Sequence, residues 1–118
     1  MHVASGNTLI TDAPTDNHGR GEAFSPTDLV AASLGSCMMT VMGIRAEKED
    51  IDLAGLKVEI VKVMAPHPRR IDAIHLNFTW PNPPGTATQL EQLKQVALTC
   101  PVALSLHQEL QQEVTFDF

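Results

Sequence analysis

The sequence predicts an α+β fold in which an antiparallel sheet packs on one nearly all-apolar helix. An apolar run of helical length, Leu29–Ile44, follows a helix-capping signature that begins at Ser25. Two later segments, Leu56–Met64 and Ile71–Trp80, alternate apolar and polar side chains as strands do. The chain closes on a third alternating segment, Val114–Phe118. One buried helix and three strands are therefore the expected core.

The helix start is encoded by Ser25-Pro26-Thr27-Asp28. In such a capping box the Ser25 hydroxyl accepts the N–H of Asp28, and the Asp28 carboxylate accepts the N–H of Ser25. Pro26 suits the first helical position because the N–H that it lacks would have no partner there. We therefore expect a helix that begins directly after Ser25.

The apolar run Leu29–Ile44 covers every side of this helix, so we expect the helix to be buried all round. Its polar members are Ser33, Ser36 and Thr40, and no charge follows before Arg45. The run is shorter than a membrane span. A small domain rarely encloses a helix by itself. The sheet, a second subunit or both should therefore wrap it.

The remaining elements follow from local signals. We expect a short strand at Thr8–Thr11, a loop at Asp12–Glu22, an amphipathic helix that opens with the capping box Thr88-x-x-Glu91 and ends near Thr99, and a short helix at Val102–Glu109. The two middle strands should form a hairpin. The second of them should point Ile74, Leu76, Phe78 and Trp80 inward and Ala73, His75, Asn77 and Thr79 outward.

Composition narrows the class of protein. The 118 residues fit a single domain, 1–118. The net charge of −6, with no basic cluster larger than Arg69–Arg70, argues against a nucleic-acid or anionic-membrane partner. No signal peptide or transmembrane segment is readable, so we expect a cytoplasmic protein. A reducing compartment makes a structural disulfide between the two cysteines unexpected.

Cys37 and Cys100 are the candidate reactive groups. Cys100 precedes Pro101 at a predicted helix start, where free N–H groups lower the pKa of a thiol. Cys37 lies inside the apolar helix, where burial alone would keep it protonated, so it is either a small core residue or a reactive thiol. No metal motif, hydrolase signature or P-loop is present, and the five histidines are isolated. No metal or cofactor is therefore expected.

Three motifs carry a resemblance to a known family. They are S-P-T-D-L-V-A-A-S-L-G-S-C-M from Ser25, L-K-V-E-I from Leu56, and A-L-T-C-P-V-A-L-S-L around Cys100. In this combination a cysteine lies twelve residues after the capping serine, and a later C-P-V opens a second helix. From about Ser25 to its end, the chain resembles the OsmC/Ohr family of osmotically inducible and organic-hydroperoxide-resistance proteins.

The resemblance implies the OsmC-like fold, with two subunits intertwined as a homodimer around their central helices. It also implies a redox function. Cys37 would attack a small hydrophobic peroxide and become a sulfenic acid, and Cys100 would resolve that acid to a disulfide. An external dithiol of the lipoyl or thioredoxin type would then restore both thiols by exchange.

Two positions depart from the family pattern. The family peroxidases carry Asn-Pro-Glu at the helix start, so Thr27 occupies the glutamate position here. Asp28 is the adjacent acid, turned by about 100° around the helix. The family arginine that pairs with this glutamate comes from N-terminal strands that are short or missing in this sequence, and Arg20 is the nearby candidate.

These departures leave two function hypotheses open. The first is a thiol-dependent peroxidase, which the retained Cys37 and Cys100 favour. The second is a dimeric thiol protein of the same fold that binds or senses a small hydrophobic or electrophilic molecule, which the altered helix start favours.

Overall fold

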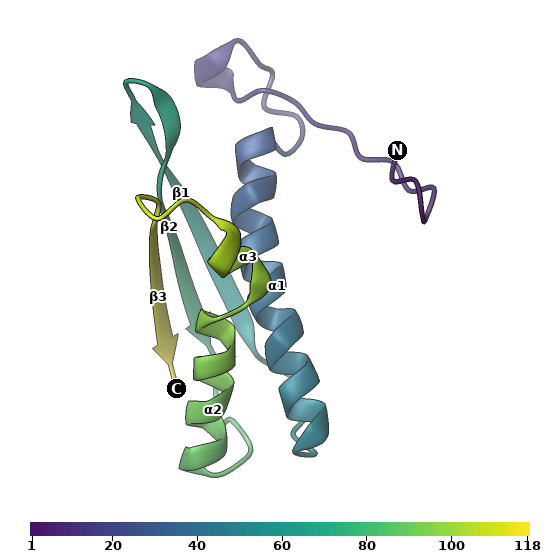
Figure 1. Cartoon of the computed structure of the whole chain (residues 1–118), viewed down its shortest axis with the longest axis vertical. Helices are drawn as coiled ribbons and strands as arrows, with labels where there is room; N and C mark the ends of the chain where they lie inside the picture. The colour runs from purple at the N-terminus through teal and green to yellow at the C-terminus, as the bar shows by residue number, and fades with distance from the viewer. The chain divides into compact units, whose positions relative to one another are not determined.

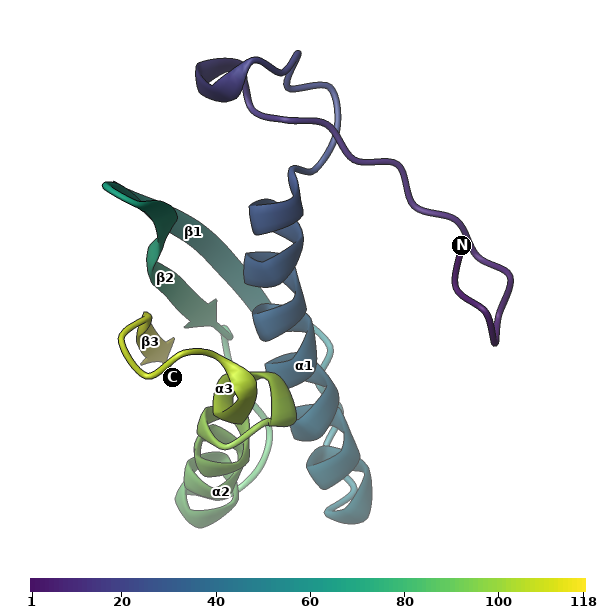
Figure 2. The ribbon, with the colours of Figure 1, turned by 45° about the horizontal axis from the view of Figure 1, so that its top comes forward.

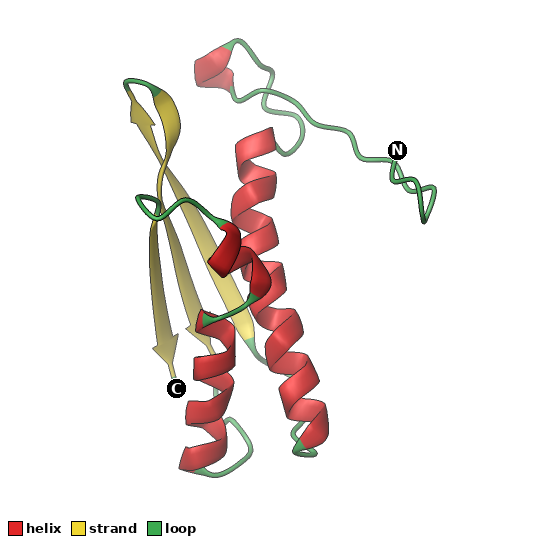
Figure 3. Ribbon diagram, viewed as in Figure 1, coloured by secondary structure: helices red, strands yellow, loops and turns green.

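The computed structural model describes all residues, 1–118, as two compact units, Met1–Val30 and Ala31–Phe118. Figure 1 shows the chain from its N-terminus to its C-terminus, and Figure 3 separates helices, strands and loops. The elements in order are η1 (Thr15–Asn17), α1 (Pro26–Lys48), β1 (Lys57–Pro66), β2 (Arg69–Thr79), α2 (Ala87–Leu98), α3 (Pro101–Ser105) and β3 (Gln111–Asp117).

The predicted start of α1 is confirmed. The Ser25 N–H donates to Oδ2 of Asp28 at 2.9 Å, and the Asp28 N–H donates to Oγ of Ser25 at 3.0 Å. The helix continues past Ile44 to Lys48, and near its end Arg45 forms an ion pair with Glu49 at 2.9 Å. Four-residue spacing places these two side chains on one side of the helix.

The N-terminal unit contains a hydrogen-bonded loop. The Asp12 carboxylate accepts the N–H groups of Glu22 at 3.1 Å and Arg20 at 3.2 Å. These bonds, that of Glu22 first, lower the pKa of Asp12. The expected loop at Asp12–Glu22 is thus present, with η1 inside it. The expected strand at Thr8–Thr11 is wrong, because a strand needs a partner and no segment of the chain pairs with these residues.

The sheet has the order β1-β2-β3 and is mixed. The antiparallel hairpin of β1 and β2 is confirmed, with a register shift at Val63/Met64. β3 pairs parallel to β2, from Ala73↔Gln111 to Thr79↔Asp117. The expectation of a wholly antiparallel sheet is therefore wrong. The chain crosses over through α2 and α3 before β3, and such a crossover returns it in the same direction as β2.

One face of the sheet forms the core, and it is ordered along the strands. At one end aromatic rings pack together: Phe78 stacks on Phe116 at 5.1 Å between centroids, and Trp80 meets Phe118 edge-on at 5.4 Å. The next row is aliphatic, with Ile60 paired to Leu76 and Leu76 to Val114. The row after that pairs Lys62 to Ile74 and Ile74 to Gln112. Polar groups therefore enter this face at the end opposite the rings.

The predicted inward side of the second strand is confirmed, since Ile74, Leu76 and Phe78 of β2 and Trp80 directly after it are all buried. The predicted outward side holds one exception. Ala73 is also buried, although His75 and Asn77 beside it on that face are exposed. A methyl side chain between larger neighbours exposes little surface whichever face it occupies.

Helices α1 and α2 lie on the same face of the sheet (Figures 1 and 2). The side of α1 that meets the sheet is fully buried and consists of Ala31, Leu34, Gly35, Met38, Met42 and Ala46. Its opposite side is exposed and carries Ser33, Ser36, Thr40 and Ile44. The single chain therefore buries one side of the helix, and burial of the other side by a second subunit stays a prediction. The polar residues of the run recur every three or four positions and so share one side of the helix.

By length and composition alone, α1 could cross a membrane, and about a third of its most apolar window is buried within the chain. The core helix of a non-membrane protein meets the same criteria, so this feature does not by itself indicate a membrane protein.

Each of the two C-terminal helices begins directly after an N-cap residue, Thr86 for α2 and Cys100 for α3. The capping box of α2 is formed by Thr86 and Gln89 rather than by Thr88 and Glu91: the Gln89 N–H donates to Oγ1 of Thr86 at 3.2 Å. Both pairs have the required spacing, and the earlier one forms. α3 ends at Ser105 rather than Glu109, because Leu106 is extended with ψ 154°.

Candidate functional site

The two cysteines lie on different helices, and both are free thiols. Cys37 is in the middle of α1 and half-buried, whereas Cys100 precedes α3 and is 0% exposed. In the single chain Cys37 is therefore the more exposed of the two cysteines, and a molecule from solvent cannot meet Cys100 without a change in structure. Because their exposure differs, the two cysteines cannot play the same role toward a ligand from solvent.

Cys100 is the N-cap residue of α3. Its backbone is extended, with φ −66° and ψ 155°, as favoured for a residue before proline, and Pro101 begins the helix. Its Sγ accepts the N–H of Ala103 at 3.4 Å, and its carbonyl accepts the N–H of Leu104 at 3.1 Å. The sulfur thus takes the place of the oxygen that usually caps a helix.

The structure brings the two predicted cysteines together. The Cys37 thiol lies near enough to the Cys100 thiol to influence its pKa, and both side chains pack in the same apolar core. Burial raises the pKa of Cys100 above its ordinary value, and the neighbouring Cys37 raises it further, while the N–H of Ala103 opposes both effects. The expectation that the helix start would lower this pKa is therefore wrong, because desolvation outweighs the N–H groups. Cys100 is a protonated thiol at neutral pH.

Packing against the sheet fixes the position of α1 near Cys37. Gly35, two residues earlier, lies against Ile60 of β1 and Leu76 of β2. Met38 is completely buried beside the cysteine. Toward the core, Cys37 packs against apolar side chains, which suit a small hydrophobic ligand better than a charged one.

The other predicted site residues belong to the N-terminal unit, Met1–Val30. The Thr27 hydroxyl lies 3.1 Å from that of Ser25, and Asp28 caps the helix as described above. The Arg20 side chain is exposed, and its backbone N–H donates to Asp12. An activating role for any of the three stays a prediction.

Two polar side chains at inward positions of the sheet escaped the sequence analysis. They are Lys62 on β1 and Gln112 on β3, which flank the buried Ile74. Gln112 donates from Nε2 to the carbonyl of Ala103 at 2.9 Å. Strand alternation could have revealed both residues. Lys62 lies on the same strand face as Val58 and Ile60, and Gln112 lies on the same face as Val114 and Phe116.

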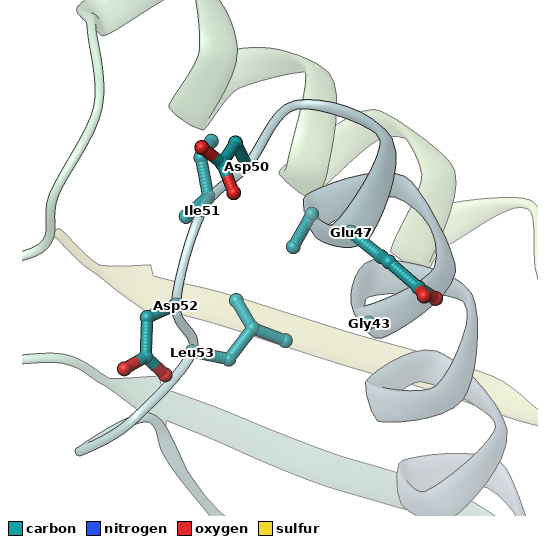
Figure 4. A pocket seen from close by; sticks show the side chains of 7 residues that line it. Gly43, Glu47, Asp50, Ile51, Asp52 and Leu53 are labelled. Carbon is teal, nitrogen blue, oxygen red and sulfur yellow. The ribbon is translucent and has the colours of Figure 1, made fainter.

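Other hollows and clusters lie apart from the cysteines. A shallow depression of about 460 Å³ lies at the end of α1 and in the loop after it; Figure 4 shows Glu47, Asp50 and Asp52 around it. On the outward face of the sheet, Nδ1 of His75 lies 3.0 Å from Oε2 of Glu113. No group of three His, Cys, Asp or Glu side chains is placed to hold a metal ion.

Comparison with known proteins identifies the family of this chain. The profile of the OsmC-like protein family matches residues 19–115, most of the chain. The chain belongs to the OsmC-like family. A comparison with curated proteins gave no match.

Solved structures share the fold of this OsmC-like protein. It is 48% identical to a protein from Psychrobacter arcticus 273-4 named for an osmotic stress induced and detoxification response, with a TM-score of 0.90 over 98% of this chain and 84% of that one. An organic hydroperoxide resistance protein from Legionella pneumophila is 18% identical, with a TM-score of 0.67 over 91% and 79% of the two chains. An organic hydroperoxide resistance protein from Elizabethkingia anophelis is 16% identical, with a TM-score of 0.65 over 88% and 76%.

Proposed function

We propose that this OsmC-like protein is a cytoplasmic, thiol-dependent peroxidase for small hydrophobic hydroperoxides. The observation that carries the proposal is the pairing of a half-buried Cys37 with a fully buried Cys100 whose pKa the neighbouring Cys37 raises. Two thiols in contact can share a two-electron oxidation as one disulfide, which a lone thiol cannot do. Membership of a family with hydroperoxide-resistance proteins supports the same reaction.

The reaction begins at Cys37. Its thiolate attacks the distal oxygen of the hydroperoxide, the O–O bond breaks, and the alkoxide leaves and takes up a proton as the alcohol. Cys37 becomes a sulfenic acid. Access supports this assignment, because the 0% exposure of Cys100 keeps that sulfur from meeting the peroxide first.

Cys100 then closes the disulfide. Its sulfur attacks the sulfenic sulfur of Cys37, the hydroxyl leaves, and the proton of the Cys100 thiol completes a water molecule. The raised pKa of Cys100 retains this proton until it is needed. A dithiol reductant of the lipoyl or thioredoxin type attacks the disulfide, leaves as its own disulfide and returns both cysteines to thiols.

A homodimer is part of the proposal. The side of α1 that the chain leaves open includes Ile44, 53% exposed, and the small residues Ser33, Ser36 and Thr40. Small side chains let another backbone approach closely, and burial of Ile44 against a second copy would remove apolar surface from water. A partner subunit would also enclose the open side of Cys37.

A peroxidase assay tests the proposal. The protein is mixed with cumene hydroperoxide or hydrogen peroxide, each with dihydrolipoamide or with reduced thioredoxin, and peroxide consumption is followed. We expect turnover of cumene hydroperoxide in preference to hydrogen peroxide, abolished in Cys37→Ser. Cys100→Ser should lose turnover while Cys37 still consumes one equivalent. No consumption by the unaltered protein with either reductant would contradict the proposal.

A second candidate function rests on the helix start. Thr27 lies where a peroxidase of the family carries glutamate, and Oδ2 of Asp28 already accepts the hydrogen bond of the Ser25 N–H. Without an acid–arginine pair to hold a thiolate, the same cysteine pair would bind or sense a hydrophobic or electrophilic molecule. Stoichiometric modification of Cys37 by an alkylating electrophile, without peroxide turnover, would favour this function.

A further inference from the structure

The helix that carries Cys100 is too short to satisfy its own backbone. α3 spans five residues, Pro101–Ser105, and a carbonyl in a helix normally accepts the N–H four residues later. For Ala103 that partner would be His107, which lies beyond the helix end. The Ala103 carbonyl therefore needs a partner from elsewhere in the fold.

Gln112 supplies that partner. Its Nε2 donates to the Ala103 carbonyl at 2.9 Å in a partly buried position. Gln112 is the polar member of the inward side of β3, whose other members are Val114 and Phe116; Phe118 follows directly after the strand. Strand pairing with the fully buried Ile74 fixes its backbone. A polar side chain in that position costs free energy unless it is hydrogen-bonded, and this bond satisfies it.

The same residue, Ala103, also holds the sulfur of Cys100. Its N–H donates to Sγ at 3.4 Å, while its carbonyl accepts from Gln112 at 2.9 Å. Two hydrogen bonds therefore connect the sheet to the Cys100 sulfur through one residue. Cys100 is also fully buried and has Cys37 as a neighbour, so movements of α3 change the distance between the two thiols.

We propose that Gln112 is a positioning residue that holds α3 so that Cys100 lies within reach of Cys37 for disulfide formation. This inference rests on the proposed function for its biological meaning, but disulfide closure itself can be measured without peroxide. Gln112 touches neither sulfur, so it acts on the closure step and not on the attack of Cys37 on an oxidant.

Gln112→Met tests the inference, because methionine has a similar length, suits an apolar face and cannot donate. The control is Gln111→Met, the adjacent and exposed position on the same strand. Each protein is oxidised in two ways: with diamide, which takes two electrons and two protons from a pair of thiols, and with cumene hydroperoxide. Disulfide closure is followed by quenching with an alkylating reagent, and sulfenic acid at Cys37 by dimedone capture.

We expect Gln112→Met to slow disulfide closure on the order of tenfold with both oxidants, since the hydrogen bond between the neutral Gln112 amide and the Ala103 carbonyl is lost. Sulfenic acid formation at Cys37 should keep its rate, and Gln111→Met should match the unaltered protein. Gln112→Lys, which restores an N–H donor, should recover part of the closure rate. A purely structural role would instead slow both steps together and would not respond to the lysine.

The outcomes separate the two proposals. If the unaltered protein closes the disulfide with diamide but not with peroxide, the peroxidase proposal fails and the Gln112 comparison still decides the inference. Equal closure rates in Gln112→Met and Gln111→Met would overturn the inference, as would failure of the unaltered protein to close with either oxidant.

Discussion

Gly35 of α1 lies so close to Ile60 of β1 that a Cβ atom on Gly35 would overlap the Cδ1 atom of Ile60. The same Cβ would lie 3.5 Å from Cδ2 of Leu76. The missing side chain at Gly35 therefore lets the helix approach the sheet, and Cys37 follows two residues later. The helix segment that carries Cys37 is therefore held close to the sheet.

Two glycine substitutions on α1 should have opposite effects on stability. Gly→Ala in a helix interior stabilises by about 1 kcal/mol when space allows. Gly43 allows it, because the nearest atom to a new Cβ would be Cδ1 of Leu53 at 3.9 Å. At Gly35 the overpacking costs roughly 1–3 kcal/mol and outweighs this gain. Denaturant unfolding of Gly43→Ala and Gly35→Ala measures both changes.

A double variant identifies the cause. Ile60→Val removes the Cδ1 atom that the new methyl group would meet, so it should recover part of the stability lost in Gly35→Ala. Equal stabilisation by Gly35→Ala and Gly43→Ala would show that α1 does not approach the sheet as closely as described.

The raised pKa of Cys100 predicts a stability that depends on alkaline pH. The folded chain holds the thiol proton more tightly than the unfolded chain, whose thiol has an ordinary pKa of 9.0. This contribution is therefore complete below about pH 9 and is lost as the pH rises through the folded pKa. Thermal unfolding between pH 7 and 11 should show a steeper loss in the unaltered protein than in Cys100→Ser. Parallel curves for the two proteins would contradict the assignment.

The capping box should contribute measurably to the stability of α1. Ser25→Ala removes the oxygen that accepts the Asp28 N–H at 3.0 Å and should cost about 1 kcal/mol. Ser36→Ala is the matched control, because Ser36 is exposed within the same helix and alanine favours helix there. The difference between the two unfolding free energies isolates the cap. A control that destabilises as much as Ser25→Ala would argue against it.

Arg20 remains the predicted cation for the Cys37 thiolate. The dipole of α1 cannot replace it, since Cys37 lies about 18 Å from the helix start and the dipole acts mainly over one turn. Arg20→Met should therefore slow alkylation of Cys37 by iodoacetamide at pH 7, by about tenfold for each 1.4 kcal/mol of lost thiolate stabilisation. Arg70→Met, at the hairpin, should leave the rate unchanged. An unchanged rate in Arg20→Met would leave an arginine of the partner subunit as the candidate.

Local signals in the sequence predicted much of the fold. The Ser25–Asp28 box, the hairpin of β1 and β2 and the inward side of β2 all formed as expected, because each depends on neighbours within a few residues or on simple alternation. The parallel pairing of β3 was missed, because strand alternation is the same for both directions. The choice of Thr86 over Thr88 was missed because both positions have the spacing of a cap.

The candidate site was predictable in its residues but not in its electrostatics. The C-P-V motif located Cys100 at a helix start, yet the depth of its burial depends on packing from several elements and raises the pKa that the local motif would lower. Gln112 was visible as a polar residue on an apolar strand side. Its bond to Ala103 required the crossover that brings β3 back beside α3.

The most direct test of the account is the fate of the two cysteines after one equivalent of cumene hydroperoxide. Peptide mapping without reductant should find a Cys37–Cys100 disulfide within one chain, and Cys100→Ser should instead give a dimedone adduct at Cys37. Both thiols intact after the peroxide treatment, or Cys37 oxidised to sulfinic acid while Cys100 stays a free thiol, would contradict a resolving pair.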